Sequence, residues 1–99
     1  MDVKIIENWA EVTGEITGIN KSLQFDDFDE INIRISDIKS YENYPNLLDK
    51  QPGGIITVTL RNTVVKELNL KLKDILKALV RVAPKKKYFA RQDKIEILN

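Results

Sequence analysis

The feature that most constrains the fold is a strict alternation of apolar and polar residues along short segments of the chain. Residues 31–36 alternate strictly and residues 55–60 alternate from Ile56 onward, so every second side chain points to the same side. The residues predicted to point inward are Ile31, Ile33 and Ile35 in the first segment, and Ile56, Val58 and Leu60 in the second. A period of two residues is typical of half-buried strands, and the sequence therefore predicts a mostly β domain.

Three further segments extend this pattern. Residues 9–19 predict a first strand, in which Gly14 and Gly18 mark a bulge or sharp bend of the kind that lets a small barrel turn a corner. The last two predicted strands cover residues 75–83 and residues 94–98, the second after a return over residues 88–91. Five short strands leave hydrophobic edges exposed unless the sheet closes, so we expect a barrel.

The connections between the predicted strands are less regular. Residues 63–73 fit either a short helix or an irregular crossover, and Thr63 is a candidate helix cap. Residues 39–54 form a long connection, in which a short helical turn over residues 41–49 is limited by Pro45.

Two residue types are missing, and their absence restricts the chemistry. The 99 residues contain neither cysteine nor histidine, which excludes disulfides, thiolate nucleophiles and the commonest general base and metal ligand. We therefore expect a non-enzymatic protein without a cofactor or a metal. The length fits one domain over residues 1–99, and the lack of cysteine suits a reducing cytoplasm. Apolar runs stay far below the roughly 20 residues that span a bilayer, and no signal peptide is visible, so we expect a cytoplasmic protein without membrane contacts.

Charge is divided unevenly along the chain. Residues 1–50 carry five basic and eleven acidic side chains, a net charge of −6, whereas residues 51–99 carry eleven basic and four acidic ones, a net charge of +7. This division points to a side that binds a polyanion, unless the two halves interleave in the fold and their charges mix. The acidic residues 26–30 fit a solvated loop better than a hard-cation site, because their spacing is not that of an EF-hand loop.

The order of these segments carries a resemblance to a known family. The residues that carry it are Val-Thr-Gly-Glu-Ile-Thr-Gly-Ile at 12–19, the run at residues 72–82, and residues 87–90 and 95–98. Together they resemble an OB-fold domain of the single-stranded nucleic-acid-binding type. Many OB domains have a glycine-aspartate turn before the fourth strand, and here Lys73 precedes Asp74, so the conformation of this turn is left open.

The resemblance implies a five-stranded OB-type barrel that binds single-stranded DNA or RNA. The ligand would lie on the outer surface of the second and third strands, between the loop joining strands one and two and the hairpin joining strands four and five.

The candidate binding residues combine cations with aromatic rings. Residues 85–91 read Lys-Lys-Lys-Tyr-Phe-Ala-Arg, which puts cations for phosphates beside rings on which a base can stack, although a solvated hairpin tip would look similar. Alternation puts Tyr88 and Phe89 on opposite faces, so at most one of them belongs to the core. Arginines on the outer face can both pair with phosphate and stack on a base. The predicted site residues are Arg34, Arg61, Lys85, Lys86, Lys87, Tyr88, Phe89 and Arg91.

One expectation favours a different function. The predicted outer face of strands two and three carries no aromatic residue, since its side chains are Asn32, Arg34, Ser36, Thr57, Thr59 and Arg61. The alternative is therefore a structural or protein-interaction subunit of a larger complex. Its contacts would come from the acidic loop around Phe25 and Phe28, or from Tyr41 and Tyr44, which stand three residues apart and would stack on one side of a turn.

Overall fold

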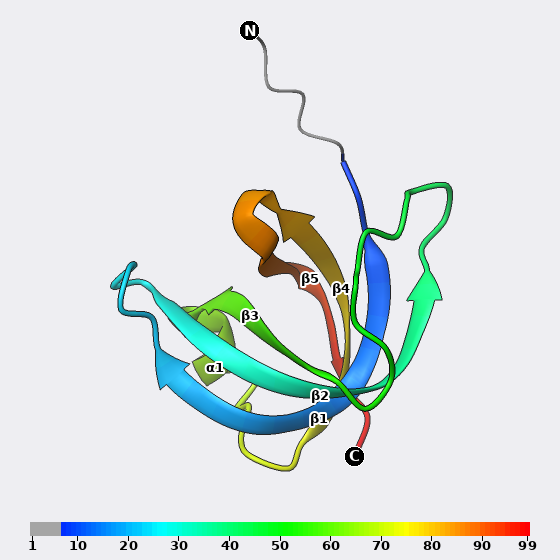
Figure 1. Ribbon diagram of the computed structural model, residues 1–99. Coiled ribbons are helices and arrows are strands. Elements are labelled where there is room, and N and C mark those ends of the chain that lie inside the picture. The colour runs from blue at the N-terminus through cyan, green and yellow to red at the C-terminus, as the bar shows by residue number, and fades with distance from the viewer. Residues whose placement is uncertain (1–6) are drawn as a thin grey trace, which may run out of the picture.

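A computed structural model describes residues 7–99 as a five-stranded sheet closed into a barrel (Figure 1). The strands are β1 (Ala10–Lys21), β2 (Phe28–Ser40), β3 (Ile55–Arg61), β4 (Ile75–Ala83) and β5 (Lys87–Ile97). A short helix, α1 (Asn62–Glu67), joins β3 to β4, and a 3-10 turn, η1 (Pro84–Lys86), joins β4 to β5. The order around the barrel is β1-β2-β3-β5-β4, with β4 paired back to β1. The predicted fold class, a mostly β five-stranded barrel with a short helix after the third strand, is confirmed.

Alternate residues of the strands build the barrel core. All six residues predicted to point inward from the second and third strands are buried: Ile31, Ile33, Ile35, Ile56, Val58 and Leu60. They form one cluster with residues of the other strands, among them Val12, Ile16, Leu76, Val80 and Tyr88. The alternation in the sequence therefore predicted which side of β2 and β3 faces the core.

The bend predicted in the first strand is also confirmed. The pairing of β1 with β2 shifts register between Thr13 and Gly14 and again between Ile16 and Gly18. The first half of β1 pairs with both β2 and β4, and β1 and β2 curve together around the barrel (Figure 1). A close backbone approach requires the glycine at position 14, because a Cβ atom there would lie 2.5 Å from the carbonyl oxygen of Arg34.

The turn before β4 takes the conformation that a glycine would favour. Lys73 has φ of 74°, in the left-handed region. Its N–H donates to the carbonyl of Ile16 (2.8 Å), and the N–H of Ile16 donates to the carbonyl of Asp74 (2.9 Å). The buried carboxylate of Asp74 accepts hydrogen bonds from the backbone of Lys71 (3.1 Å) and the side chain of Asn99 (3.3 Å). The turn thus joins β1, β4 and the C-terminal residue.

A side chain extends the pairing of β1 and β4 beyond the strands. Asn8 is buried, its amide donates to the carbonyl of Val82 (2.9 Å), and its Oδ1 accepts from the N–H of Val82 (2.8 Å). Since Ala10 pairs with Val80 in the ladder, Asn8 occupies the next matching position.

Several local predictions were wrong. Thr63 lies inside α1, whose N-cap residue is Arg61, so Thr63 does not cap the helix. Residues 41–49 form no helix, and the N–H of Tyr44 donating to the carbonyl of Tyr41 (3.1 Å) marks a single turn. β2 begins three residues earlier than predicted and β5 seven residues earlier.

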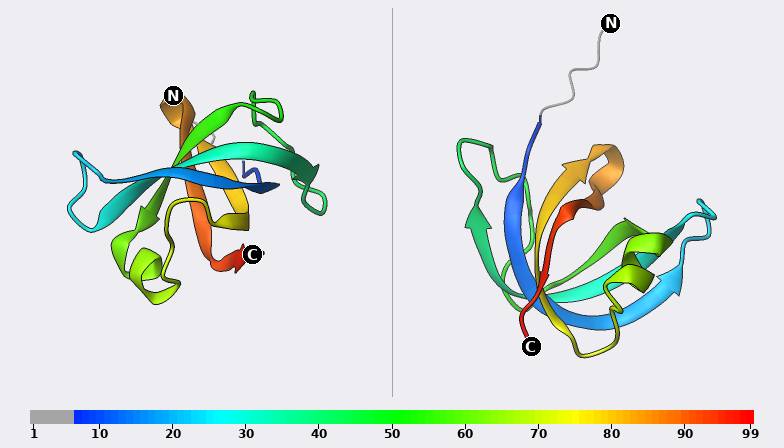
Figure 2. Two further views of the ribbon diagram at one scale, coloured as in Figure 1. Left: turned by 90° about the horizontal axis from the view of Figure 1, so that it is seen from below. Right: turned by 180° about the vertical axis from the view of Figure 1, so that it is seen from behind.

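The helix α1 lies beside the loop that joins β1 to β2 (Figure 2). The N–H of Asn62 donates to the carbonyl of Asp27 in that loop (3.0 Å), and Val64 and Val65 point into the core. No helix within residues 7–99 has the length and apolar character needed to cross a membrane.

Candidate functional site

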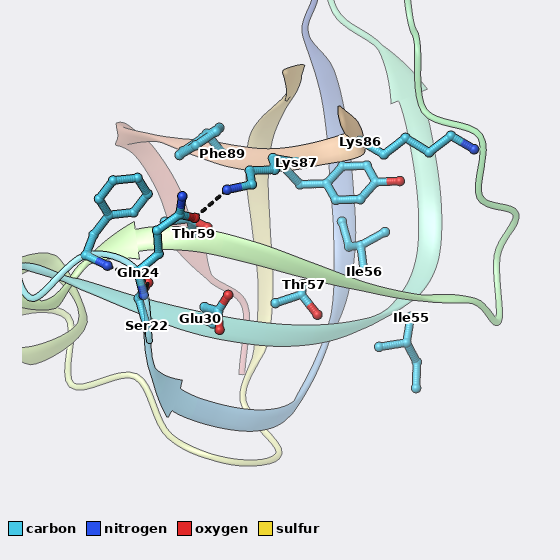
Figure 3. Close-up of a pocket in the computed structure, with 12 residues that line it drawn as sticks. Ser22, Gln24, Glu30, Ile55, Ile56, Thr57, Thr59, Lys86, Lys87 and Phe89 are labelled. Atoms are coloured by element: carbon cyan, nitrogen blue, oxygen red, sulfur yellow. Dashed lines mark hydrogen bonds between the residues drawn. The ribbon is translucent and has the colours of Figure 1, made fainter. Parts of the chain in front are cut away.

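A hollow of about 340 Å³ lies on the outer surface where β2, β3 and the start of β5 meet (Figure 3). The loop between β1 and β2 forms one wall, and the hairpin between β4 and β5 forms another. Its lining includes Gln24, Phe25, Glu30, Thr59, Lys87 and Phe89. The position is the one that the OB resemblance implies for a ligand.

The short contact between β3 and β5 forms the base of this hollow. The two strands pair in parallel over only two residue pairs, Val58 with Tyr88 and Thr59 with Phe89. Val58 and Tyr88 point into the core, so Thr59 and Phe89 point outward. Strand pairing therefore places an aromatic ring beside the outer face of β3.

Residues from four strands follow one another in a row across this face. Glu30 of β2 stands opposite Thr59 of β3, Thr59 stands opposite Phe89 of β5, and Phe89 stands opposite Arg81 of β4. The guanidinium carbon of Arg81 lies 5.7 Å from the centre of the Phe89 ring, within the range of a cation–π contact.

The outer face carries aromatic residues that the sequence analysis did not place there. Because β2 begins at Phe28, that ring lies on the same outer face as Glu30, opposite Arg61, whose guanidinium carbon is 5.3 Å from the ring centre. Phe25 packs edge-on against Phe28 at 5.9 Å. The expectation of a face without aromatics was therefore wrong. The alternation continued backwards from Ile31 would have assigned Phe28 to this face.

The predicted lysines lie at the rim of the hollow. Lys87 donates a hydrogen bond to the side-chain oxygen of Gln24 and stands 5.8 Å from the centre of the Phe25 ring. Lys86 lies 3.1 Å from the carboxylate of Asp49, and its side chain is 78% exposed. Lys85 is exposed in the hairpin turn, where its φ of 65° is left-handed. Two of the three lysines, Lys86 and Lys87, line the hollow itself.

Tyr88 is a core residue whose hydroxyl reaches Asp49, the ion-pair partner of Lys86, at the surface. Its exposed fraction is 8%, and its hydroxyl donates to Asp49 at 2.9 Å. Burial raises the pKa of the Tyr88 hydroxyl, and the adjacent carboxylate adds to this. The hydrogen bond from Tyr88 lowers the pKa of Asp49, and Lys86 lowers it further. Of the two rings predicted to stack on a base, Phe89 is therefore the one that faces outward.

We expect Tyr88→Phe to raise the pKa of Asp49 towards its ordinary value, because the substitution removes the largest cause of the shift. A lowered carboxyl pKa stabilises the fold above the unfolded pKa near 4 and loses that contribution as pH falls through the folded value. The difference in the free energy of unfolding between the wild type and Tyr88→Phe therefore becomes smaller at acidic pH. Carboxyl carbon shifts followed by nuclear magnetic resonance against pH measure the Asp49 pKa, and a smaller rise is expected in Lys86→Gln. An unchanged pKa in Tyr88→Phe contradicts the assignment.

None of the three predicted arginines lines the hollow, and the guanidinium of Arg61 lies over the Phe28 ring. Arg34 forms an ion pair with Glu15 at 2.5 Å on the neighbouring strand. Arg91 pairs with Asp93 at 2.9 Å in a bulge of β5, where residues 91–94 stand opposite the single residue Leu79 of β4. The structure thus brings Lys86, Lys87, Tyr88 and Phe89 together around the hollow. The other predicted site residues do not line it: Arg34, Arg61, Lys85 and Arg91.

Within residues 7–99, no three carboxylates come close enough together to hold a metal ion.

Comparison of the chain with protein-family models and with curated protein sequences gives no match.

Proposed function

We propose that this protein is a non-enzymatic barrel that binds single-stranded DNA or RNA in the hollow between β2, β3 and β5. The observation that carries the proposal is the pairing of three phenylalanine rings on and beside this outer face with a cation each. The pairs are Phe25 with Lys87, Phe28 with Arg61, and Phe89 with Arg81.

The two kinds of group match the two parts of an unpaired nucleotide. Exposed rings accept the face of a base, and one such stack contributes about 1–3 kcal/mol. Arginine and lysine meet the phosphates, and within residues 7–99 none of Arg61, Arg81 and Lys87 is held in an ion pair. A stacking surface of this kind needs bases that are free of a partner strand, which favours single strands over duplexes.

The test is binding of fluorescent twelve-nucleotide thymidine and uridine strands at increasing salt concentration. With three to five phosphate contacts, the logarithm of the binding constant is expected to fall with the logarithm of salt concentration at a slope of about −2 to −3.5. The double substitution Lys86→Gln/Lys87→Gln is expected to make the slope shallower by about 1.4. No binding at low salt, or binding that is indifferent to salt, rejects the proposal.

A matched control separates the hollow from overall charge. Lys66→Gln/Lys71→Gln removes the same charge from two exposed lysines on α1 and the loop after it. We expect this control to leave the slope near the wild-type value. If both double variants made the salt dependence of binding shallower by the same amount, the nucleic-acid strand would not be bound at the hollow.

A second candidate, a protein-interaction subunit, is favoured by an apolar surface elsewhere on the barrel. Ile75 and Leu98 are 41% and 46% exposed, and the N–H of Leu98 donates to the carbonyl of Ile75 (2.8 Å), so the two side chains belong to neighbouring strand ends. Light scattering after size-exclusion chromatography tests self-association through this surface, and failure of oligonucleotide binding leaves this candidate in place.

A further inference from the structure

One carboxylate, that of Glu30, lies in a hollow otherwise lined by cations, aromatic rings, uncharged polar groups and the aliphatic side chains of Ile55 and Ile56. Glu30 is half-buried there, and within residues 7–99 no donor forms a hydrogen bond or an ion pair with its side-chain carboxylate. A carboxylate repels phosphates and accepts hydrogen bonds only. In a site for nucleic acid, its natural partner is therefore the donor edge of a base.

The sheet places Glu30 at a suitable distance from a stacking ring. Glu30, Thr59 and Phe89 are direct neighbours across three adjacent strands, and Figure 3 shows the three side chains following one another in this order. Strands lie about 4.8 Å apart, so Glu30 and Phe89 are separated by about 10 Å across β3. A base stacked on Phe89 extends its edge over Thr59 towards Glu30.

We propose that Glu30 selects guanine among the four bases, an inference that rests on the proposed binding of single strands. Guanine presents two adjacent donors, N1–H and the 2-amino group, which match the two oxygens of a carboxylate. The O6 and N7 atoms of the same base are acceptors, and the ammonium group of Lys87 and the hydroxyl of Thr59 in the same hollow are donors for them.

The other bases fit this arrangement less well. Adenine and cytosine each place a ring-nitrogen acceptor beside their amino group, and that acceptor would face the carboxylate. Thymine and uracil flank a single N–H with two carbonyl oxygens. Guanine is thus the common base with two neighbouring donors on its Watson–Crick edge.

The experiment uses the full chain and nine-nucleotide thymidine strands that differ only at the central position. A single central guanine avoids quadruplex formation, and anisotropy of a terminal fluorophore reports binding. We expect the guanine strand to bind about tenfold or more tightly than the strands with central adenine, cytosine or thymine. Hypoxanthine, which lacks the 2-amino group, is expected to fall between guanine and adenine.

Substitution of Glu30 separates recognition of the base from binding of the strand. Glu30→Gln keeps one acceptor and loses the charge, so the guanine preference is expected to fall to less than threefold while the all-thymidine strand binds at least as well as before. Glu67→Gln, which removes an exposed carboxylate from α1, is expected to keep the preference. Circular dichroism melting establishes that both variants are folded.

The outcomes distinguish this inference from the function on which it rests. If no strand binds at low salt, the proposed function fails. If all central bases bind equally, or if Glu30→Gln keeps the full preference, guanine selection by Glu30 is overturned while strand binding stands. A preference for another base also overturns it.

Discussion

Replacement of Gly14 by alanine is expected to lower the free energy of unfolding by about 3 kcal/mol, at the upper end of the cost of overpacking. The new Cβ atom would lie 2.5 Å from the carbonyl oxygen of Arg34 and 2.5 Å from Cγ2 of Ile33. The first of these contacts is with backbone, and relieving it means moving β2 away from β1 where their register shifts. Urea unfolding followed by circular dichroism measures the change. The slope of the unfolding free energy against urea concentration is expected to stay the same, because the folded barrel keeps its size.

Gly18→Ala is the matched control on the same strand. Its Cβ atom would meet the side-chain amide nitrogen of Asn32 at 2.9 Å, and the end of a flexible side chain can turn away. We expect a loss below about 1 kcal/mol. If the two alanine variants lost the same stability, the cost would come from the glycines' backbone freedom and not from the close approach at Gly14.

Phe89→Ala is expected to weaken binding of single strands by about 10- to 100-fold, the equivalent of one lost base stack. The ring faces outward from β5 and lines the hollow, with Arg81 beside it. The core is left intact because Tyr88, on the opposite face, keeps its place. Anisotropy titration of the thymidine strand measures the change, and Phe89→Trp, which keeps a stacking surface, is expected to retain binding.

Tyr44→Ala controls for the loss of an aromatic ring as such. Tyr44 stacks on Tyr41 at 6.1 Å between ring centres, in the connection between β2 and β3, and does not line the hollow. We expect the affinity of Tyr44→Ala for the thymidine strand to stay within twofold of the wild type. A loss in Tyr44→Ala as large as that in Phe89→Ala would place the strand over the tyrosine pair and away from the hollow.

The regular part of the fold could be predicted from the sequence because alternation is a local property. The inward sides of β2 and β3 follow from residues two apart, and β4 was predicted with its observed bounds. The bend at Gly14 could also be anticipated, since glycine inside a strand pattern marks close backbone approach. The atom that it approaches, the carbonyl oxygen of Arg34, depends on the pairing of β1 with β2.

The parts of the candidate site that were missed depend on contacts between distant segments. Asp29 interrupts the apolar alternation of β2, so the sequence pattern indicates a loop over residues 26–30 and does not assign Phe28 to the outer face. In the barrel Asp29 pairs with Lys21 and Leu60 near the end of the strands, where it remains partly exposed and a polar residue is tolerated. The pairing of Thr59 with Phe89 joins strands separated by a helix and another strand, and no local pattern encodes it.

The uneven charge of the two halves does not become two separate faces. Strands of the first half pair with strands of the second, as β1 does with β4. At the hollow, Lys86 lies against Asp49 and Lys87 against Gln24, while Glu30 lines the same hollow as these lysines. The surface around the hollow is thus mixed in charge, and the side-chain carboxylate of Glu30 has no hydrogen-bond or ion-pair partner there within residues 7–99.

β3 and β5 are joined by only two residue pairs, which makes this contact the weakest part of the closed barrel. Local opening is easiest where the fewest hydrogen bonds must break, so we expect the contact between β3 and β5 to open most readily. The proposed ligand would lie across the contact between β3 and β5, touching β2 and β3 on one side and β5 on the other. A bound oligonucleotide would then hold β3 and β5 together and slow amide hydrogen exchange at the backbone hydrogen bonds between them.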